Sequence, residues 1–168
     1  MRDEKTYSQQ FLTPSTVEGI RQKLGVTAIL RHRLSHSGFA LHQEQVQAPA
    51  FKLNGRTGMA ERATSIIQRG VLLEPVLHLA FSTSEDADTA ATQHLCLCRN
   101  EDVLFPSPLN EALVVTVSEE EWNMIAGFEL LFGREEDVFL VGYNRFTGGE
   151  PMYGRLTISS QPTVSPSS

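Results

Sequence analysis

The chain has 168 residues, of which 40% are hydrophobic and 20% are charged, so it is long enough to bury a core and lacks the composition of a disordered chain. Its formal net charge of -6 argues against a nucleic-acid partner, because affinity for the phosphate backbone comes from clustered Lys and Arg. No apolar run approaches the ~20 residues that cross a bilayer, and the N-terminus lacks the apolar stretch of a secretory signal. We therefore expect a soluble, cytoplasmic protein with no membrane partner, although signal-independent secretion stays open.

The cysteine content fits the same compartment. Cys96 and Cys98 are the only cysteines, and they lie two positions apart. This spacing is too short for a useful structural disulfide, and it is typical of a protein kept in a reducing environment.

The N-terminal part predicts a helix followed by a hairpin. Thr13 followed by Pro14 is a helix-start signal, because proline lacks an N–H that the first turn does not use. Apolar residues at helical spacing extend this helix over residues 14–24. Strands are predicted near 26–34 and 38–46, on either side of a polar turn.

A second helix is predicted after a short edge strand. Phe51 and Leu53 give the edge strand, and Asn54-Gly55 turns the chain. Thr57 is then positioned to cap a helix that ends at Gly70, a residue type that often terminates helices. The apolar face of this helix would consist of Met59, Ala63, Ile66 and Ile67.

The central segment alternates between short strands and a short helix. Residues 76–81 are apolar and bounded by turn formers, which predicts a buried strand. Ser84 is positioned to cap an acidic helix over 85–92, whose carboxylates suit the positive end of the helix dipole. Further strands are predicted at 94–98 and 111–117.

The C-terminal part predicts one long helix and a closing hairpin. Ser118 and Glu121 form a capping box, and the helix they begin is expected to end at Gly133. Strands at 138–143 and 152–158 flank a Gly/Pro-rich connection, which is typical of a hairpin with a longer loop. The apolar face of the helix consists of Trp122, Ile125, Phe128, Leu131 and Phe132.

Together these elements predict an α+β fold with a mostly antiparallel sheet and three to four helices, because hairpins replace strict βαβ alternation. We expect a single domain over residues 14–159. The polar segment 1–13 is predicted to be flexible, and the Ser/Pro tail 160–168 is predicted to be disordered.

One set of short motifs points to a specific chemistry. Arg33 precedes Ser82-Thr83-Ser84, which precedes Glu119 and Glu121 in a Glu-x-Glu arrangement. This order resembles the Arg, Ser-Thr-Ser, Glu-x-Glu class of mono-ADP-ribosyltransferases. The resemblance implies an NAD-dependent enzyme in which Arg33 contacts the NAD phosphates and Ser82 orients the second glutamate. Glu121 would then face the ribose as nicotinamide leaves and steady its positive charge, with Glu119 as the first acid of the pair.

Each part of that motif also has a structural interpretation. Glu119 and Glu121 lie in the first turn of the predicted capped helix, whereas the family places this pair at the start of a strand. Ser82 fits a strand-to-helix turn, since hydroxyls bond nearby backbone groups there. Asn54-Gly55-Arg56-Thr57, with His78-Leu79 further on, also resembles RNA 2′-phosphotransferases of the same fold, although Asn54 replaces the expected histidine.

Metal binding is a further alternative. His94, Cys96 and Cys98 alternate along a predicted strand and would share one face. Structural zinc normally takes four ligands, and no second pair follows. The two cysteines are more simply small core residues beside Leu95 and Leu97, so no metal site is predicted.

The hypothesis favoured by the sequence is a protein-binding or regulatory module, such as an adaptor, an immunity protein or a chaperone-like protein. The acidic charge, the polar tail and the absence of the common nucleophile and phosphate-loop motifs favour a partner that is another protein. No cofactor is expected under this hypothesis, and NAD is expected under the ADP-ribosyltransferase alternative. The sequence does not indicate an oligomeric state.

Overall fold

The computed structural model describes residues 5–97, 103–109, 111–133 and 136–159. Their contacts group into two compact units. The hairpin unit contains the described residues up to Ser8 together with Ser37–Leu73, and the core unit contains Gln9–His36 and the chain from Glu74 onward. Both units are built mainly from antiparallel strands, and three helices are described, which confirms an α+β class that is richer in strands than expected.

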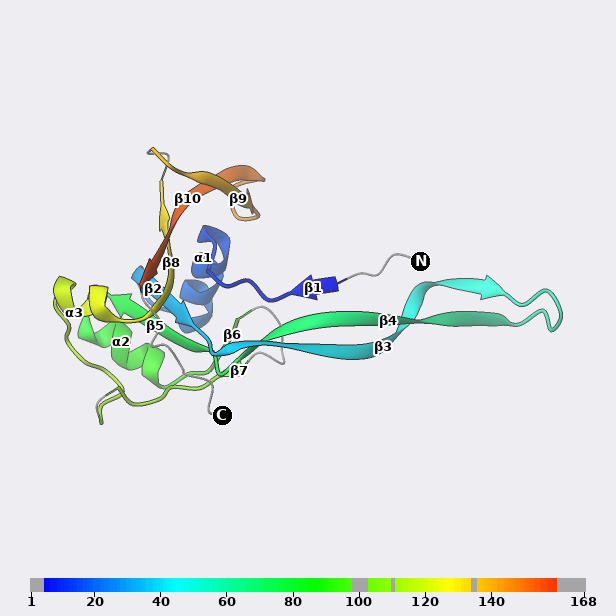
Figure 1. Cartoon of the computed structure of the whole chain (residues 1–168), viewed down its shortest axis with the longest axis horizontal. Coiled ribbons are helices and arrows are strands. Elements are labelled where there is room, and N and C mark those ends of the chain that lie inside the picture. Colours follow the sequence, from blue (N-terminus) through cyan, green and yellow to red (C-terminus); the bar gives the residue numbers. More distant parts are fainter. Residues whose placement is uncertain (1–4, 98–102, 110, 134–135, 160–168) are drawn as a thin grey trace, which may run out of the picture. The chain divides into compact units, whose positions relative to one another are not determined.

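The hairpin unit is a three-stranded sheet in the order β1-β4-β3. Its strands are β1 (Lys5–Tyr7), β3 (Gly38–Leu53) and β4 (Ala60–Leu73). Strands β3 and β4 run antiparallel from the Gly38–Leu73 pair to the Leu53–Ala60 pair, as Figure 1 shows, with a register shift between Gln47 and Phe51. Strand β1 lies parallel to β4 and pairs only with residues 68–70.

The predicted helix from Thr57 to Gly70 is wrong, because this segment belongs to a turn and to β4. Met59, Ala63 and Ile67 also fit a period of two, and pairing with β3 on both sides of the register shift holds the segment as a strand. Thr57 accepts a hydrogen bond from the N–H of Met59 within the turn instead of capping a helix. The strand predicted to end near residue 46 continues to Leu53 across the register shift.

The core unit contains a five-stranded sheet in the order β5-β2-β8-β10-β9, in which every pair is antiparallel. A two-stranded sheet of β6 and β7 and three helices complete the described part of the unit. The strands are β2 (Ile29–Ser35), β5 (Val76–Phe81), β6 (Leu95–Cys96), β7 (Val103–Leu104), β8 (Gly127–Phe132), β9 (Phe139–Asn144) and β10 (Glu150–Ser159). The helices are α1 (Pro14–Leu24), α2 (Ser84–Ala91) and α3 (Glu119–Met124).

Several predicted elements are confirmed in this unit. Helix α1 has the predicted bounds, with Thr13 as N-cap and Gly25 in the left-handed conformation that ends it. Strand β5 covers the predicted residues, and β9 and β10 form the predicted hairpin. Helix α2 is also present, although Thr83 rather than Ser84 caps it through a hydrogen bond with the N–H of Asp86.

The core of the core unit is formed by α1 with the residues that flank it, by β2 and β8, and by Trp122 of α3. The buried apolar side chains include Leu12, Val17, Ile20, Leu24, Val26, Leu34, Trp122 and Leu130. Leu12 is 1% exposed although it lies in the segment 1–13, which the sequence predicts as flexible, and residues 5–7 of that segment form β1. Residues 1–4 and the predicted tail 160–168 lie outside the described residues.

The long C-terminal helix is shorter than predicted. Its capping box is present, but α3 ends at Met124 and the chain continues as β8. Gly127 explains the change of direction: it adopts φ +134, and a Cβ atom there would lie 2.7 Å from the carbonyl oxygen of Leu34. The chain therefore turns next to β2 at a position that only glycine fills without strain.

The strands predicted at 94–98 and 111–117 are only partly present. Strand β6 covers Leu95–Cys96, and residues 113–117 form no strand. The assignment of both cysteines to the core is wrong for Cys96, which is exposed, because Leu95 and Leu97 supply the buried side chains of this segment. Cys98 lies outside the described residues.

Candidate functional site

Arg33 and Glu129 form a buried ion pair at the centre of the core unit. Their side chains are 1% and 2% exposed, and Arg33 Nη2 lies 2.8 Å from Glu129 Oε2. Arg33 points inward from β2, and Glu129 comes from the adjacent strand β8. The other terminal nitrogen of Arg33 donates to the carbonyl oxygens of Trp122 and Ile125, at the end of α3. Arg33 therefore neutralises one buried acid and donates to two carbonyls at the end of the short helix, one of which, that of Trp122, also accepts the N–H of Ile125.

Arg31 joins the Arg33–Glu129 ion pair, and the three residues form part of a charged cluster. Its Nε and Nη2 atoms donate to the two carboxylate oxygens of Glu129 at 2.7 and 2.8 Å, a bidentate arrangement. The other terminal nitrogen of Arg31 pairs with Glu119 in the first turn of α3. The guanidinium groups of Arg31 and Arg33 lie 5.4 and 5.6 Å from the ring centre of Trp122, whose N–H also donates to Glu129.

The charged cluster perturbs two titratable groups. Burial alone would raise the pKa of Glu129, but the hydrogen bonds from Arg31, Arg33 and Trp122 outweigh it, so the pKa is lowered. Burial lowers the pKa of His32 to about 4, against a smaller opposing effect of the Glu129 charge. His32 is therefore neutral at pH 7, which fits its Nε2 atom accepting the N–H of Leu130.

The residues predicted for ADP-ribosyl transfer are only partly brought together. Arg33 and Glu119 belong to the same charged cluster, linked through Arg31 and Glu129. Glu121 accepts the N–H of Ser118 in the capping box. Ser82 follows the end of β5 and is exposed, and no hydrogen bond or ion pair between described residues joins it to Arg33 or Glu121.

Glu129 is the member of this cluster that the sequence analysis does not identify. It stands between Phe128 and Leu130, in a segment whose apolar spacing predicts the end of a helix. In β8 its side chain is 2% exposed, so it is not the solvent-facing acid that an amphipathic helix would present there. A charged residue inside an apolar run, with two arginines on an earlier strand, is the signal that points to such a buried pair.

The second candidate is the hairpin end, which we define as residues 51–62 of the hairpin unit. Three large apolar side chains are mostly exposed there: Phe51 is 62%, Leu53 is 78% and Met59 is 68% exposed. Phe51 and Leu53 lie two residues apart on β3 and therefore share one face of the hairpin. Two neighbouring exposed apolar side chains on one face form a candidate contact surface for a partner.

The turn of the hairpin end has a defined conformation. The N–H of Asn54 donates to the carbonyl of Met59, and the N–H of Gly58 donates to the carbonyl of Asn54. The Asn54 side chain accepts the N–H of Arg56 and donates to Glu61. These bonds hold the connection in one shape, so the adjoining apolar side chains are presented from an ordered support rather than from a loose loop.

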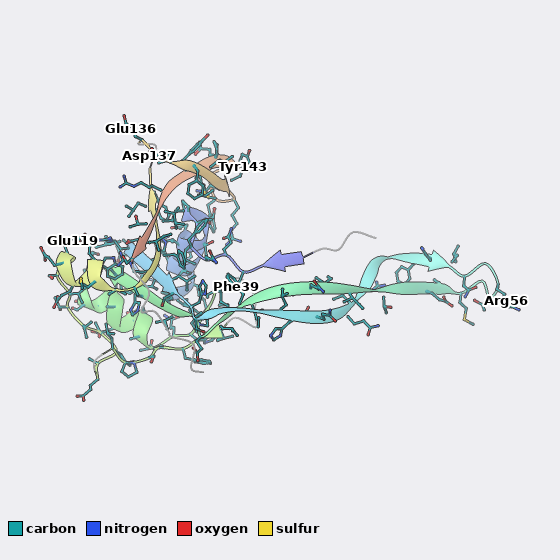
Figure 2. The ribbon with its side chains drawn as sticks, in the orientation of Figure 1. Phe39, Arg56, Glu119, Glu136, Asp137 and Tyr143 are labelled. Carbon is teal, nitrogen blue, oxygen red and sulfur yellow. The ribbon has the colours of Figure 1, made fainter. Side chains whose placement is uncertain are left out.

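The charge of the hairpin end differs from that of the whole chain. The segment carries Lys52, Arg56 and Arg62 against the single acid Glu61, whereas the chain has a net charge of -6. All three basic side chains are exposed, and Figure 2 shows Arg56 at the opposite end of the hairpin from Phe39. The guanidinium of Arg62 lies 4.4 Å from the ring centre of Phe51, so a basic and an aromatic group form one surface.

Other features bear less on function. The described residues contain no group of three or more metal-binding side chains; His94 and Cys96 are both exposed, and Cys98 lies outside that part of the chain. None of the described helices is both long enough and apolar enough to cross a membrane. Comparisons with protein-family models, with curated proteins and with solved structures gave no match.

Proposed function

We propose that this protein is a protein-binding module and that its hairpin end docks onto an acidic partner protein. The observation that carries the proposal is the exposure of Phe51, Leu53 and Met59 beside three basic side chains. Large apolar and aromatic groups of this kind provide most of the binding energy in protein interfaces when a partner pocket covers them.

The structure of the hairpin favours recognition of a folded surface. Backbone hydrogen bonds already hold the hairpin end, so docking costs little conformational entropy. An apolar pocket of the partner would cover the face of Phe51 and Leu53. The rim would meet Lys52, Arg56 and Arg62, which complement acidic side chains and accelerate the encounter.

The charge pattern favours a protein over the other anionic partners. Three basic residues in the segment 51–62 are too few for strong phosphate-backbone binding, which needs many simultaneous contacts. A single short apolar cluster likewise gives little affinity for a lipid surface without an extended basic segment. A protein pocket provides charge attraction and apolar burial as well, and it adds shape complementarity to both.

The ADP-ribosyltransferase hypothesis remains a separate proposal. Under it, NAD would have to reach Arg33, whose guanidinium is buried against Glu129, and Glu121, whose carboxylate caps α3. No contact within the described chain assembles these groups around Ser82. We therefore base the proposed function on the hairpin end.

Site-specific photo-crosslinking in lysate of the source organism tests the proposal. A photoreactive phenylalanine analogue replaces Phe51 in one variant and Phe105, an equally aromatic and 74% exposed residue of the core unit, in the control. The proposal predicts that Phe51 captures one specific protein of acidic isoelectric point and that Phe105 does not. Capture must also disappear when Lys52, Arg56 and Arg62 are changed to glutamate.

Three results would contradict the proposal. One is equal capture of the same protein from both positions, and another is capture that survives the charge reversals. The third is crosslinking at Phe51 only to a second copy of the chain or to lipid. Circular dichroism of each variant would verify that the strands of the hairpin are retained.

A further inference from the structure

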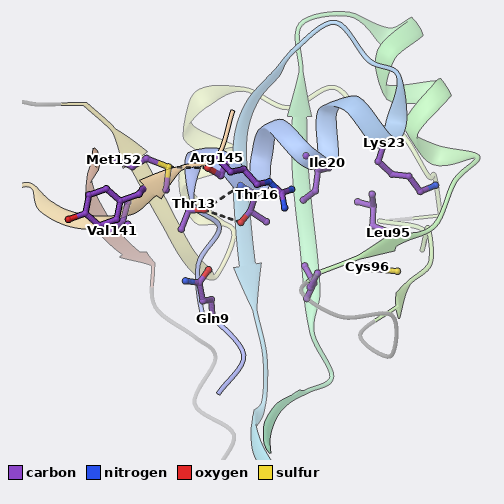
Figure 3. A pocket seen from close by; sticks show the side chains of 15 residues that line it. Gln9, Thr13, Thr16, Ile20, Lys23, Leu95, Cys96, Val141, Arg145 and Met152 are labelled. Carbon is purple, nitrogen blue, oxygen red and sulfur yellow. Dashed lines mark hydrogen bonds between the residues drawn. The ribbon is translucent and has the colours of Figure 1, made fainter. Parts of the chain in front are cut away.

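A groove of about 640 Å³ runs along helix α1 in the core unit, within the size range of small-molecule sites. Figure 3 shows side chains of α1 along this groove, with residues of β9 and β10 toward one end and Leu95 and Cys96 toward the other. Ile20, Leu95 and Leu97 supply buried apolar surface. The groove is thus apolar along much of its wall.

Hydrogen bonds fix the end of the groove near the start of α1. The Ser15 hydroxyl donates to Asn144 at 3.1 Å and also lies 3.3 Å from the sulfur of Met152, which joins α1 to the hairpin of β9 and β10. Thr13 and Thr16, whose hydroxyl oxygens lie 3.0 Å apart, line the same end. The hydroxyls of Ser15 and Thr13 are thus used within the fold, and they fix the shape of this wall.

The connection between β9 and β10 places Arg145 across α1. Asn144 accepts the N–H groups of Thr147 and Gly149 through its carbonyl and that of Phe146 through its side chain, so the connection is tightly turned. The terminal nitrogen Nη2 of Arg145 lies only 3.0 Å from where a Cβ atom of residue 19 would stand. Gly19, in the middle of a helix, thus leaves room for the guanidinium, although glycine costs about 1 kcal/mol relative to alanine there.

Among the described residues that line the groove, the charged ones have one sign. They are Lys23 and Arg145, and neither forms an ion pair within the described part of the chain. Arg145 lies against Gly19, and Gly19 and Lys23 are four residues apart. Their backbones are therefore separated by about 6 Å along the helix axis. The guanidinium of Arg145 lies 4.8 Å from the ring centre of Phe146, and no described acid pairs with it or with Lys23. Two such cations along one groove, in a chain of net charge -6, attract an anion.

We propose that this groove binds a small amphiphilic anion, which carries a phosphate or carboxylate group next to an aromatic or aliphatic body. Arg145 and Lys23 hold the anionic group, and the half-buried Thr16 lines the same groove and offers its hydroxyl for a further polar contact. The body of the ligand packs on the buried apolar wall of Ile20, Leu95 and Leu97. This site is independent of the hairpin end and of its partner.

Titration calorimetry with 2-naphthyl phosphate, and with neutral 2-naphthol as its uncharged counterpart, tests the site. The phosphate should bind the full chain at least about tenfold more tightly than the naphthol. Arg145→Gln and Lys23→Gln should each weaken phosphate binding about fivefold, which is the strength of a favourable exposed charge pair. Arg155→Gln removes the same charge from β10 outside the groove and should leave the affinity unchanged.

Gly19→Ala gives a second variant that does not depend on removing a charge. The new methyl group lies 3.0 Å from Nη2 of Arg145, so the guanidinium must shift, which should weaken phosphate binding more than naphthol binding. Alanine has the higher helix propensity, and circular dichroism of the variant checks that the fold is retained. Unchanged phosphate binding by Gly19→Ala would contradict the assigned position of Arg145.

Alkylation of Cys96 provides a location test. In a Cys98→Ser chain, Cys96 is the sole cysteine, it is exposed, and it lines the groove. Bound 2-naphthyl phosphate should slow its reaction with iodoacetamide, whereas naphthol at the same concentration should protect less. The proposal is overturned if neither compound binds, if both bind equally, if Arg155→Gln loses as much affinity as the groove variants, or if Cys96 is not protected.

Discussion

Replacing Glu129 by glutamine removes one negative charge from a site that holds two arginines. The carboxylate accepts four hydrogen bonds, two from Arg31, one from Arg33 and one from Trp122. Arg31 is 24% exposed and regains water when the charge is lost, but Arg33 is 1% exposed and does not. Breaking a buried ion pair on one side costs about 3 to 5 kcal/mol, and partial hydration of Arg31 places this change near about 3 kcal/mol.

Urea unfolding followed by tryptophan fluorescence measures this loss directly, because Trp122 is the only tryptophan and contacts the charged cluster. For a chain of this length the same loss corresponds to a fall in Tm of roughly 6 to 12 °C. Glu119→Gln is the matched control: its carboxylate is 69% exposed, and exposed pairs contribute at most about 1 kcal/mol. A Glu129→Gln variant as stable as the Glu119→Gln variant would refute the assigned role of the cluster.

The pH dependence of stability provides a second test of the same ion pair. The pKa of Glu129 is lower in the folded state than its ordinary value of 4.5, so its contribution to stability is complete above that value. The contribution is lost as the pH falls through the folded pKa. Glu129→Gln should therefore lose less stability on acidification than the unaltered protein, and an identical pH dependence would contradict the ion pair.

Three further predictions concern single residues. When the pH falls from 6.5 to 4.5, His32→Gln should lose about 2 kcal/mol less stability than the unaltered protein, because the folded pKa of His32 is about 4 and protonation favours the unfolded chain. Urea titrations at the two pH values measure the free energies of unfolding, and an equal loss in both proteins would count against the prediction. Gly127→Ala should cost at least about 2 kcal/mol, since its Cβ meets the Leu34 carbonyl at positive φ, and a loss below about 0.5 kcal/mol in the same assay would show that the turn relaxes freely. Calorimetry with NAD should show no binding, because Arg33 is buried against Glu129 and the exposed Glu121 carboxylate is used to cap α3. Binding, together with NAD cleavage that Glu121→Ala abolishes, would instead support the ADP-ribosyltransferase hypothesis.

Local signals in the sequence predict the elements whose ends are set by their own residues. Thr13 and Gly25 define α1, and Ser118 with Glu121 defines the start of α3. In each case a side chain or a glycine acts on backbone groups within a few positions, so one short stretch contains the required information.

Elements set by distant contacts are not predictable in this way. Residues 60–73 have apolar positions compatible with both helical and strand periods, and pairing with β3 decides between them. The end of α3 depends on Gly127 fitting against Leu34 of β2 and on Arg33 bonding the last carbonyls. Neither contact is visible in a single stretch of sequence.

The candidate sites likewise depend on contacts between distant parts of the chain, which the sequence does not reveal. The sequence pattern singles out Arg33, Glu119 and Glu121 as catalytic groups, yet the partner that explains Arg33 is Glu129, which lies on a strand that the same pattern predicts as a helix. The hairpin end does not emerge from the sequence, because its exposed side chains fit the apolar face of a second helix or a short edge strand. A correct prediction requires the register of β3 and β4.

The most direct test of docking through the hairpin end is a measurement of affinity. The crosslinked partner is purified, and its Kd for variants of the hairpin end is determined. Phe51→Ser removes a 62% exposed aromatic ring, and Phe105→Ser removes a 74% exposed ring of the core unit. We predict that Phe51→Ser weakens binding at least about tenfold, the effect of losing an interface anchor, while Phe105→Ser leaves the Kd unchanged. Equal affinities of the two variants for the partner would contradict docking through the hairpin end.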